Sequence, residues 1–485
     1  AAAADGSATT QAPSHATDPA SQTKPALATL YFGTLVCQRC HAEPSDRVQE
    51  PISICRCNEL TIWQQQDKHK DAYQALLGPR ASRMGKLLDN RTSVSEQKDC
   101  LVCHSASLSE QSLADDSFHL EEGVSCAICH GPHEQWVEAH APPFAKQREA
   151  WRRLTGKEKQ AQFGLTDLRD PATRAALCTS CHIGNRAEGK VITHEMYAAG
   201  HPPLPGIEVA AFSDEMPRHW QYVKEKSRAV QETFKFVPSR FEESQVVLVG
   251  GMATFRETMR LLAEQAANDD RKWPQLAQFD CYACHHELES PSWRQHRAAN
   301  GKPGLPRSPN WPAVLVRLAL CHLGQSDQVF NARLKELDEA FDVQPFGKRE
   351  QISIAALHLV EWTDRPLGAL AAATVDDAAA RKLLRFLANA SQVSALDYDS
   401  ARQIAWAFRT LAKECFGASN EPWQRATAEA ESLSSSLSVR PGRSTLDPLG
   451  EALKKRNDFD PKRFREDLSG LSRLLDESLP APKGP

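Results

Sequence analysis

The stretch GVSCAICHGP, residues 123–132, holds two cysteines three positions apart and a histidine directly after the second cysteine. The same C-x-x-C-H arrangement occurs five times in this chain of 485 residues. The five motifs are Cys37, Cys40 and His41; Cys100, Cys103 and His104; Cys126, Cys129 and His130; Cys178, Cys181 and His182; and Cys281, Cys284 and His285.

C-x-x-C-H is the attachment signature of c-type haem. On a short helical turn, positions i, i+3 and i+4 lie on one face. The two thiols can therefore add to the vinyl groups along one porphyrin edge while the histidine binds the iron as proximal ligand. The motifs predict five covalent haem c groups held by all ten motif cysteines, with the five motif histidines as metal ligands.

Zinc binding and thiol redox chemistry are two other uses of C-x-x-C. Structural zinc sites also use such pairs, but they need four ligands in a tetrahedron and no histidine directly after the second cysteine. Thiol redox motifs also read C-x-x-C, but such a motif usually occurs once, near a βαβ pattern. All five pairs here carry the histidine, which favours haem over both alternatives.

The composition argues against two classes, nucleic-acid-binding proteins and membrane-spanning proteins. Hydrophobic residues make up 41% of the chain, charged residues 25%, and the formal net charge is −4. With both signs mixed, there is no electrostatic case for nucleic-acid binding. No run of 18 apolar residues occurs, so no transmembrane span is expected. The length predicts two or three domains.

The localisation prediction is periplasmic or extracellular, because haem is attached covalently outside the cytoplasm. The chain opens with AAAADGSATT, which resembles a mature end left after removal of a signal peptide. Its first residue is not Cys, so a lipid anchor at that end is not expected. Residues 1–27 are rich in Ala, Ser, Thr, Pro and Gln and are predicted to form a flexible arm.

The fold class expected is mainly α with much irregular loop. Residues 28–300 are predicted to form a pentahaem cytochrome c domain, with one longer helix over 241–269 whose Val247, Met252, Phe255, Met259 and Leu262 recur at helical spacing for packing. Residues 301–485 are predicted to form a helical C-terminal domain, with about five helices between 310 and 480. That domain is interpreted either as a cover for the haems, which is favoured, or as a docking surface for a partner.

The sixth iron ligands are expected to be mostly histidines, since 12 of the 17 histidines lie outside the proximal positions and the chain has only five methionines. Two imidazoles hold a haem iron at lower potential than a Met/His pair. The predicted distal ligands are His69, His119, His140, His194 and His201. His219, in MPRHW, is a further candidate outside this set, and His286 is considered for another haem than its own. His15, His296, His322 and His358 are not expected to be ligands.

Several phrases resemble the multihaem cytochromes c of the cytochrome c-554 family. They are YFGTLVCQRCH, DKHKDAYQALL, EEGVSCAICHGP, CTSCHIGN, THEMYAAGHPPL and FDCYACHHEL, within about residues 30–290. The resemblance implies haems in stacked pairs and electron shuttling in nitrogen-oxidising bacteria. It also implies that one haem can be five-coordinate. The family typically carries four haems, so the fifth motif and the long helical tail are departures.

Four cysteines remain outside the motifs: Cys55, Cys57, Cys321 and Cys415. They are interpreted as buried thiols, or as disulfide partners that join the tail to the haem domain outside the cytoplasm. A disulfide between Cys55 and Cys57 would close a strained small ring.

The function predicted is electron transfer through closely spaced, mostly bis-histidine haems to redox partner proteins, without catalysis. Two alternatives stay open. One is a subunit of an oligomer, larger multihaem assembly or filament. The other is a multihaem oxidoreductase acting on a small nitrogen compound at one open haem, which needs an iron with a vacant position.

Overall fold

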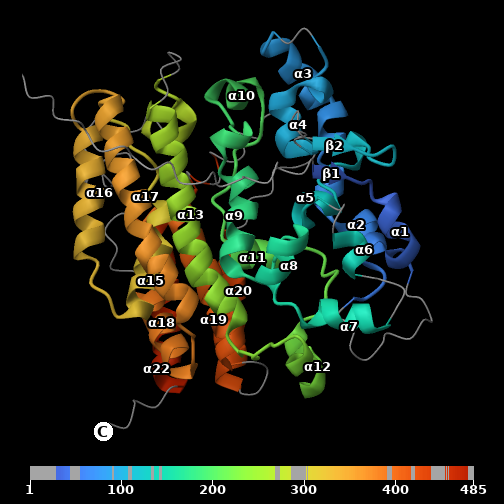
Figure 1. The fold of residues 1–485 in the computed structure, drawn as a ribbon. Helices are drawn as coiled ribbons and strands as arrows, with labels where there is room; N and C mark the ends of the chain where they lie inside the picture. The colour runs from blue at the N-terminus through green and yellow to red at the C-terminus, as the bar shows by residue number, and fades with distance from the viewer. Residues whose placement is uncertain are drawn as a thin grey trace, which may run out of the picture.

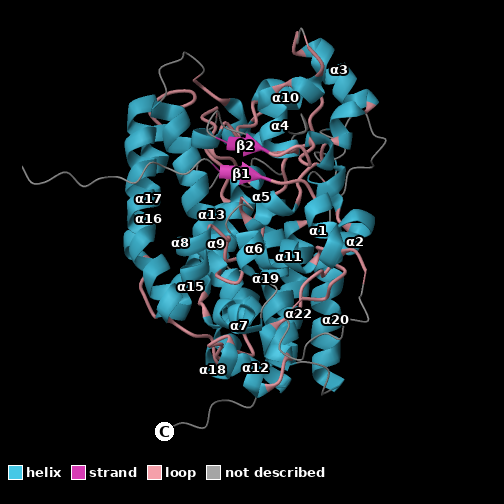
Figure 2. Ribbon diagram, turned by 45° about the vertical axis from the view of Figure 1, so that its right-hand side comes forward, coloured by secondary structure: helices cyan, strands magenta, loops and turns pink. Residues whose placement is uncertain are grey.

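The computed structural model describes residues 29–43, 55–89, 92–106, 112–132, 136–140, 145–267, 273–285, 302, 304–389, 396–416, 421–437, 450, 454, 456 and 458–478. The predicted arm, residues 1–27, lies outside these residues, as do His15, His133, His286 and His296. Helices dominate the described part of the chain (Figures 1 and 2). The prediction of a mainly α fold with much loop is confirmed.

Short helices and long connections make up the part that carries the haem motifs, on the right of Figure 1. The α-helices are α1 (Leu35–His41), α2 (Glu59–Gln66), α3 (Pro79–Leu87), α4 (Lys98–His104), α5 (Cys126–His130), α6 (Trp136–His140), α7 (Ala145–Arg153), α8 (Gly156–Phe163), α9 (Pro171–His182), α10 (His194–Ala199), α11 (Val209–Asp214) and α12 (Arg228–Thr233). The 3₁₀ turns are η1 (Lys68–Asp71), η2 (Gln74–Leu77), η3 (Val94–Glu96), η4 (Leu120–Glu122), η5 (Arg186–Glu188), η6 (Val223–Glu225), η7 (Leu276–Gln278) and η8 (Cys281–Ala283).

Two three-residue strands, β1 (Thr29–Tyr31) and β2 (Ser112–Ala114), form a small parallel sheet (Figure 2). In its register Thr29 pairs with Ser112 and Tyr31 with Ala114. The sheet ties the start of the described chain to the segment between the second and third motifs. It thereby fixes the entry into α1, where the first motif lies.

Four of the five motifs lie at the C-terminal end of an α-helix, with the motif histidine as the last helical residue. Helices α1, α4, α5 and α9 each end at a motif histidine, while the fifth motif lies on the 3₁₀ turn η8 and the residues that follow it. Helix α9 shows the local cause: the Asp170 side chain accepts a hydrogen bond from the Thr173 backbone N–H at 2.8 Å, and Pro171 occupies the first turn. Asp at the N-cap and Pro just inside are strong helix-start signals.

Long helices form the other part of the molecule, on the left of Figure 1. The predicted helix over 241–269 is α13 (Glu242–Ala267), and all five residues of its packing stripe are buried. After the short turn η10 (Trp311–Ala313) come α15 (Val314–Leu323), α16 (Gln328–Phe341), α17 (Arg349–Ala372), α18 (Asp377–Asn389), α19 (Tyr398–Phe416), α20 (Glu421–Ser436) and α22 (Pro461–Ser478). The described residues beyond 310 thus hold seven α-helices rather than about five.

One apolar core crosses the predicted boundary at residue 300. It runs from Ala175 of α9 through α13 to Leu475 of α22. A Cβ placed on Gly251 of α13 would come within 2.4 Å of Cβ of Leu315, so glycine allows α15 to approach α13 closely. The Glu414 carboxylate of α19 also accepts hydrogen bonds from the Glu243 and Ser244 backbone N–H groups, at 3.0 and 2.7 Å. The C-terminal helices therefore pack directly onto the haem-motif part.

Candidate haem sites

Each of the five motif histidines lies opposite one further histidine ring. The distances between the ring centroids are 6.2 Å for His41 and His140, 6.2 Å for His104 and His201, 6.5 Å for His130 and His219, 6.5 Å for His182 and His69, and 6.4 Å for His285 and His194. We number these pairs sites 1 to 5 in the order of their motifs along the chain.

The spacing fits one iron between each pair of rings. A metal–imidazole nitrogen bond of about 2 Å on either side, plus about 1.1 Å from each nitrogen to its ring centre, separates two axial imidazoles by about 6 Å. All five measured separations lie close to this value. Among the described residues no cluster of three or more His, Cys, Asp or Glu side chains is arranged to hold a metal ion. The paired arrangement therefore fits axial haem ligation and gives no support to tetrahedral zinc.

Carboxylates orient two of these rings. Nδ1 of His41 lies 2.7 Å from Oε2 of Glu59, and Nδ1 of His69 lies 2.9 Å from Oδ1 of Asp67. The hydrogen bond to Glu59 raises the pKa of His41. A partner on Nδ1 fixes the tautomer and leaves Nε2 to bind metal, as is usual for metal-ligating histidines.

Backbone carbonyls do the same for four other rings. Nδ1 of His104 lies 2.7 Å from the carbonyl oxygen of Ala72, and Nδ1 of His140 lies 2.6 Å from that of Val137. Nδ1 of His201 lies 2.7 Å from the carbonyl oxygen of Pro202, and Nδ1 of His219 lies 3.2 Å from that of Pro217. These contacts again leave Nε2 for the iron. Backbone carbonyls thus orient these four rings, from nearby residues for His140, His201 and His219 and from across the fold for His104.

Burial keeps ligand rings neutral. It lowers the pKa of His182 to about 4 and that of His201 to about 4, and it also lowers the pKa of His140. Only the neutral imidazole has a lone pair for a metal. These rings are therefore in the ligating form at neutral pH.

Four of the five predicted distal ligands, His69, His140, His194 and His201, lie opposite motif histidines. The fifth, His119, is exposed and precedes η4, and the partner of His130 is His219 instead. Closeness in sequence to the third motif favoured His119, but His219 lies in the loop between α11 and η6, where no helical pattern marks it. The one local signal for His219 in the sequence is the aromatic residue that follows it, Trp220. In the structure the centroids of the two rings lie 5.1 Å apart.

The remaining histidines and cysteines have other surroundings. His358 Nδ1 pairs with Oε1 of Glu336 at 2.8 Å, on the surface of the C-terminal helices. Cys415 is buried in α19, and burial raises the pKa of its thiol to about 12. Cys321 on α15 and Cys415 are not joined in a disulfide.

The attachment cysteines show which sites are neighbours. The side chains of Cys37 (site 1) and Cys126 (site 3) contact each other, and so do those of Cys103 (site 2) and Cys181 (site 4). Cys129 of site 3 lies within electrostatic range of Cys178 of site 4.

A ligand-bearing segment links site 2 to site 5. His194 (site 5) opens α10 and His201 (site 2) follows its end. Tyr197, between them, has its ring centroid 6.1 Å from that of His201 and also lines the cavity at site 5. The sites therefore follow one another in the spatial order 1, 3, 4, 2, 5.

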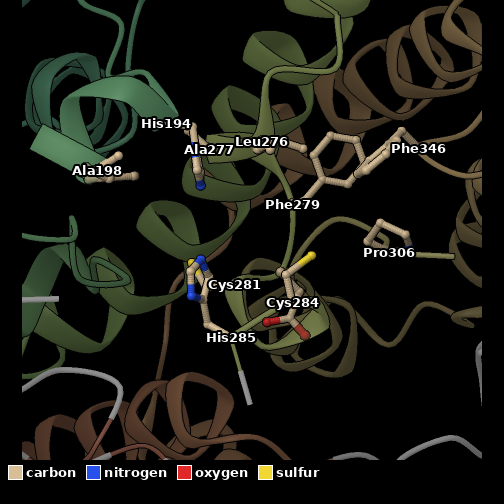
Figure 3. Close-up of a pocket in the computed structure, with 12 residues that line it drawn as sticks. His194, Ala198, Leu276, Ala277, Phe279, Cys281, Cys284, His285, Pro306 and Phe346 are labelled. Atoms are coloured by element: carbon tan, nitrogen blue, oxygen red, sulfur yellow. The ribbon is translucent and has the colours of Figure 1, made fainter. Parts of the chain in front are cut away.

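An apolar cavity lies at site 5 (Figure 3). His194 and His285 border it on one side, and Phe279 and Phe346 on the other. Pro306 and Phe346 come from the C-terminal part of the chain, so this part lines the fifth site.

No helix among the described residues is long and apolar enough to cross a membrane. Among curated proteins and solved structures, no similar chain was found. Residues 36–131 match the family described as cytochrome c554 and c-prime. This segment holds the first three motifs. By this match the chain is similar to c-type cytochromes that carry covalently bound haem c and act in electron transfer.

Proposed function

We propose that this protein is an exported pentahaem cytochrome c that transfers electrons along five closely spaced bis-histidine haems. The observation that carries the proposal is that each motif histidine lies opposite a second imidazole, at a separation that fits one iron between the two rings. Haem iron supplies reversible one-electron chemistry when it is bound. The ten cysteines would hold the porphyrins, and the ten paired histidines would fill both axial positions of each iron.

Filled axial positions favour a carrier over an oxidoreductase. Catalysis on a small nitrogen compound needs an iron with an open position and a polar distal pocket. The cavity that the described residues form at site 5 is lined mostly by apolar side chains, and both histidines of the pair border it. Tyr197 and Asp280 are its other polar lining residues, so the two histidines, which would fill both axial positions, are the main argument against catalysis there.

The row of sites supports transfer from one end of the protein to the other. The closeness of the cysteines of sites 1, 3, 4 and 2 would bring the porphyrin edges attached to them close together. Sites 1 and 5 form the two ends, and each has an exposed cysteine, Cys40 and Cys284. The ends are the natural places for redox partner proteins, or for neighbouring subunits in a larger assembly. Export to the periplasm or beyond follows from the covalent haems, which are attached outside the cytoplasm.

Two measurements test the proposal. Mass spectrometry of the denatured, fully matured protein is expected to show five haem masses above the polypeptide. The reduced protein is expected to bind no carbon monoxide, because each iron has two histidines. A stoichiometric carbon monoxide complex at one haem would favour the oxidoreductase, and four or fewer haems would refute the count.

A further inference from the structure

We propose that Arg456, held by Asp399 together with Arg402, raises the reduction potential of the haem at site 5. The inference rests on the proposed function, since it requires a haem at the fifth motif. It assigns a role in electron transfer to the C-terminal helices, which carry no attachment motif.

The three side chains form a buried charge cluster at the start of α19. Asp399 Oδ2 lies 2.8 Å from Nη2 of Arg456, and Asp399 Oδ1 lies 3.5 Å from Nη1 of Arg402. The side chains of Asp399, Arg402 and Arg456 are only 11%, 6% and 9% exposed. Buried charges are costly even when paired, because they lose their hydration. The desolvation cost of this cluster indicates a role other than stabilising the fold.

Arg456 reaches the fifth attachment motif directly. Its guanidinium carbon lies 5.3 Å from the ring centre of Tyr282, the residue that follows Cys281. The positive charge of Arg456 also acts on the sulfur of Cys281, where it opposes the rise in the thiol pKa that burial causes. That sulfur is where the porphyrin edge of site 5 would be attached, so the cation would lie beside the haem.

Arg456 is the charge that acts most strongly at the motif. Two arginines share one buried carboxylate, Asp399. Asp280 and Asp397 also face the cluster, but both are only half-buried, and both accept helix-cap hydrogen bonds from backbone N–H groups. At the Cys281 sulfur, the attraction of Arg456 is stronger than the repulsion of either Asp280 or Asp399. Burial raises the pKa of Asp399 to about 7, which weakens its negative charge further near neutral pH.

The positive charge of Arg456 should make reduction of the haem at site 5 more favourable. Reduction adds one negative charge to a haem, and a nearby buried cation stabilises that charge strongly in a low dielectric. A comparable buried cation, Lys190, lies near the cysteines of sites 2 and 4 and pairs with Glu188 at 2.5 Å, as Arg456 pairs with Asp399 at 2.8 Å. The effect of Arg456 is therefore expected at site 5, next to the motif that it contacts.

Potentiometric titration of the full-length protein, followed by the haem absorbance, tests this inference. In Arg456→Met we expect the reduction potential of one of the five haems to become more negative. The equilibrium constant for its reduction should fall about tenfold, which corresponds to about 59 mV for one electron. Arg456→Lys keeps the charge and should stay near the wild-type value. Arg317→Met is the matched control, since Arg317 lies 5.2 Å from the Phe330 ring centre in the same group of helices, away from the motifs.

A second variant reverses the sign. Asp399→Asn removes the carboxylate and leaves both arginines, so one couple should move positive. A merely structural role would not give opposite shifts, and this variant also decides the matter if Arg456→Met fails to fold. Unmoved couples, an equal shift of all five, or a shift in Arg317→Met would overturn the inference. The proposed function is judged separately, by haem mass and carbon monoxide binding of the wild type.

Discussion

The imidazole rings of His41 and His140 lie nearly parallel, at an interplanar angle of 18°, whereas those of His130 and His219 lie at 82°. The other pairs fall into the same two classes. Site 5 is near parallel at 27°, and sites 2 and 4 are near perpendicular at 84° and 89°. Hydrogen bonds of Nδ1 to backbone carbonyls or carboxylates hold six of these ten rings in place, so the angles should persist when the haems are bound.

The ring angles predict two kinds of low-spin ferric spectrum. Parallel rings interact with the same iron d orbital and split it from its partner, while perpendicular rings leave the two nearly equal in energy. Electron paramagnetic resonance of the oxidised protein should therefore show rhombic signals from sites 1 and 5. Sites 2, 3 and 4 should give signals with one large g value. Five signals of a single class would contradict the geometry.

Replacing His219 by Ala should open one iron. The variant is expected to gain one high-spin haem and one carbon monoxide site per chain, because His130 would lose its opposite ligand. His119→Ala is the matched control, since His119 is exposed and should leave the spectrum unchanged. The reverse result, with His119→Ala opening the iron, would restore His119 as the ligand and remove His219.

A buried carboxyl, Glu208, should make stability depend on pH. It caps α11 by accepting hydrogen bonds from the Ala210 and Ala211 backbone N–H groups, and burial raises its pKa to about 7. Because the pKa is raised in the folded state, the native protein binds more protons than the unfolded chain between pH 4.5 and 7. The stability from this group is present at low pH and is lost as the pH rises through about 7.

Glu208→Gln removes that dependence. The difference in unfolding free energy, variant minus wild type, should be about 1 to 3 kcal/mol larger at pH 8 than at pH 5, because only the wild type loses stability over this range. Denaturant unfolding followed by circular dichroism measures the difference. Glu158→Gln in the capping box of α8 is the control: hydrogen bonds from Thr155 lower the pKa of Glu158 below 4.5, so this carboxylate is ionised in both states and its effect should be nearly the same at pH 5 and pH 8. An equal effect of Glu208→Gln at both pH values would show that Glu208 titrates normally.

The close approach of α13 and α15 predicts a large effect of one methyl group. Gly251→Ala should destabilise the protein by about 1 to 3 kcal/mol, because the added Cβ would collide with Leu315 in the core. Gly368 of α17 has no atom within 4 Å of the same position, so Gly368→Ala should be neutral or stabilise by up to about 1 kcal/mol. If Gly251→Ala proves as stable as Gly368→Ala, the C-terminal helices do not pack on α13 as described.

The sequence predicted the motif-bearing features because they are local. The spacing C-x-x-C-H alone placed the motif residues, and the stripe from Val247 to Leu262 predicted α13. Pairing across the fold was harder, since His219 lies in a loop and meets His130 only through tertiary packing. Helix α17 is hard to predict from the sequence, because it continues through Pro366, a residue that usually ends helices.

The role of the C-terminal helices could not be read from their sequence. Their amphipathic stripes require burial but do not identify the surface that buries them. The structure supplies that surface in α13 and in the wall of site 5, where Phe346 and Arg456 contact the haem-motif part. These contacts favour a cover over an independent docking module.

Mössbauer spectroscopy of the reduced protein, enriched in ⁵⁷Fe and with its iron-to-protein ratio measured, tests the central claim most directly. It counts the irons and reports the spin state of each class. The account predicts five irons per chain, all low-spin ferrous, because each of the five motif histidines has an opposite imidazole. A high-spin ferrous component amounting to one iron per chain would contradict it and point to an open haem.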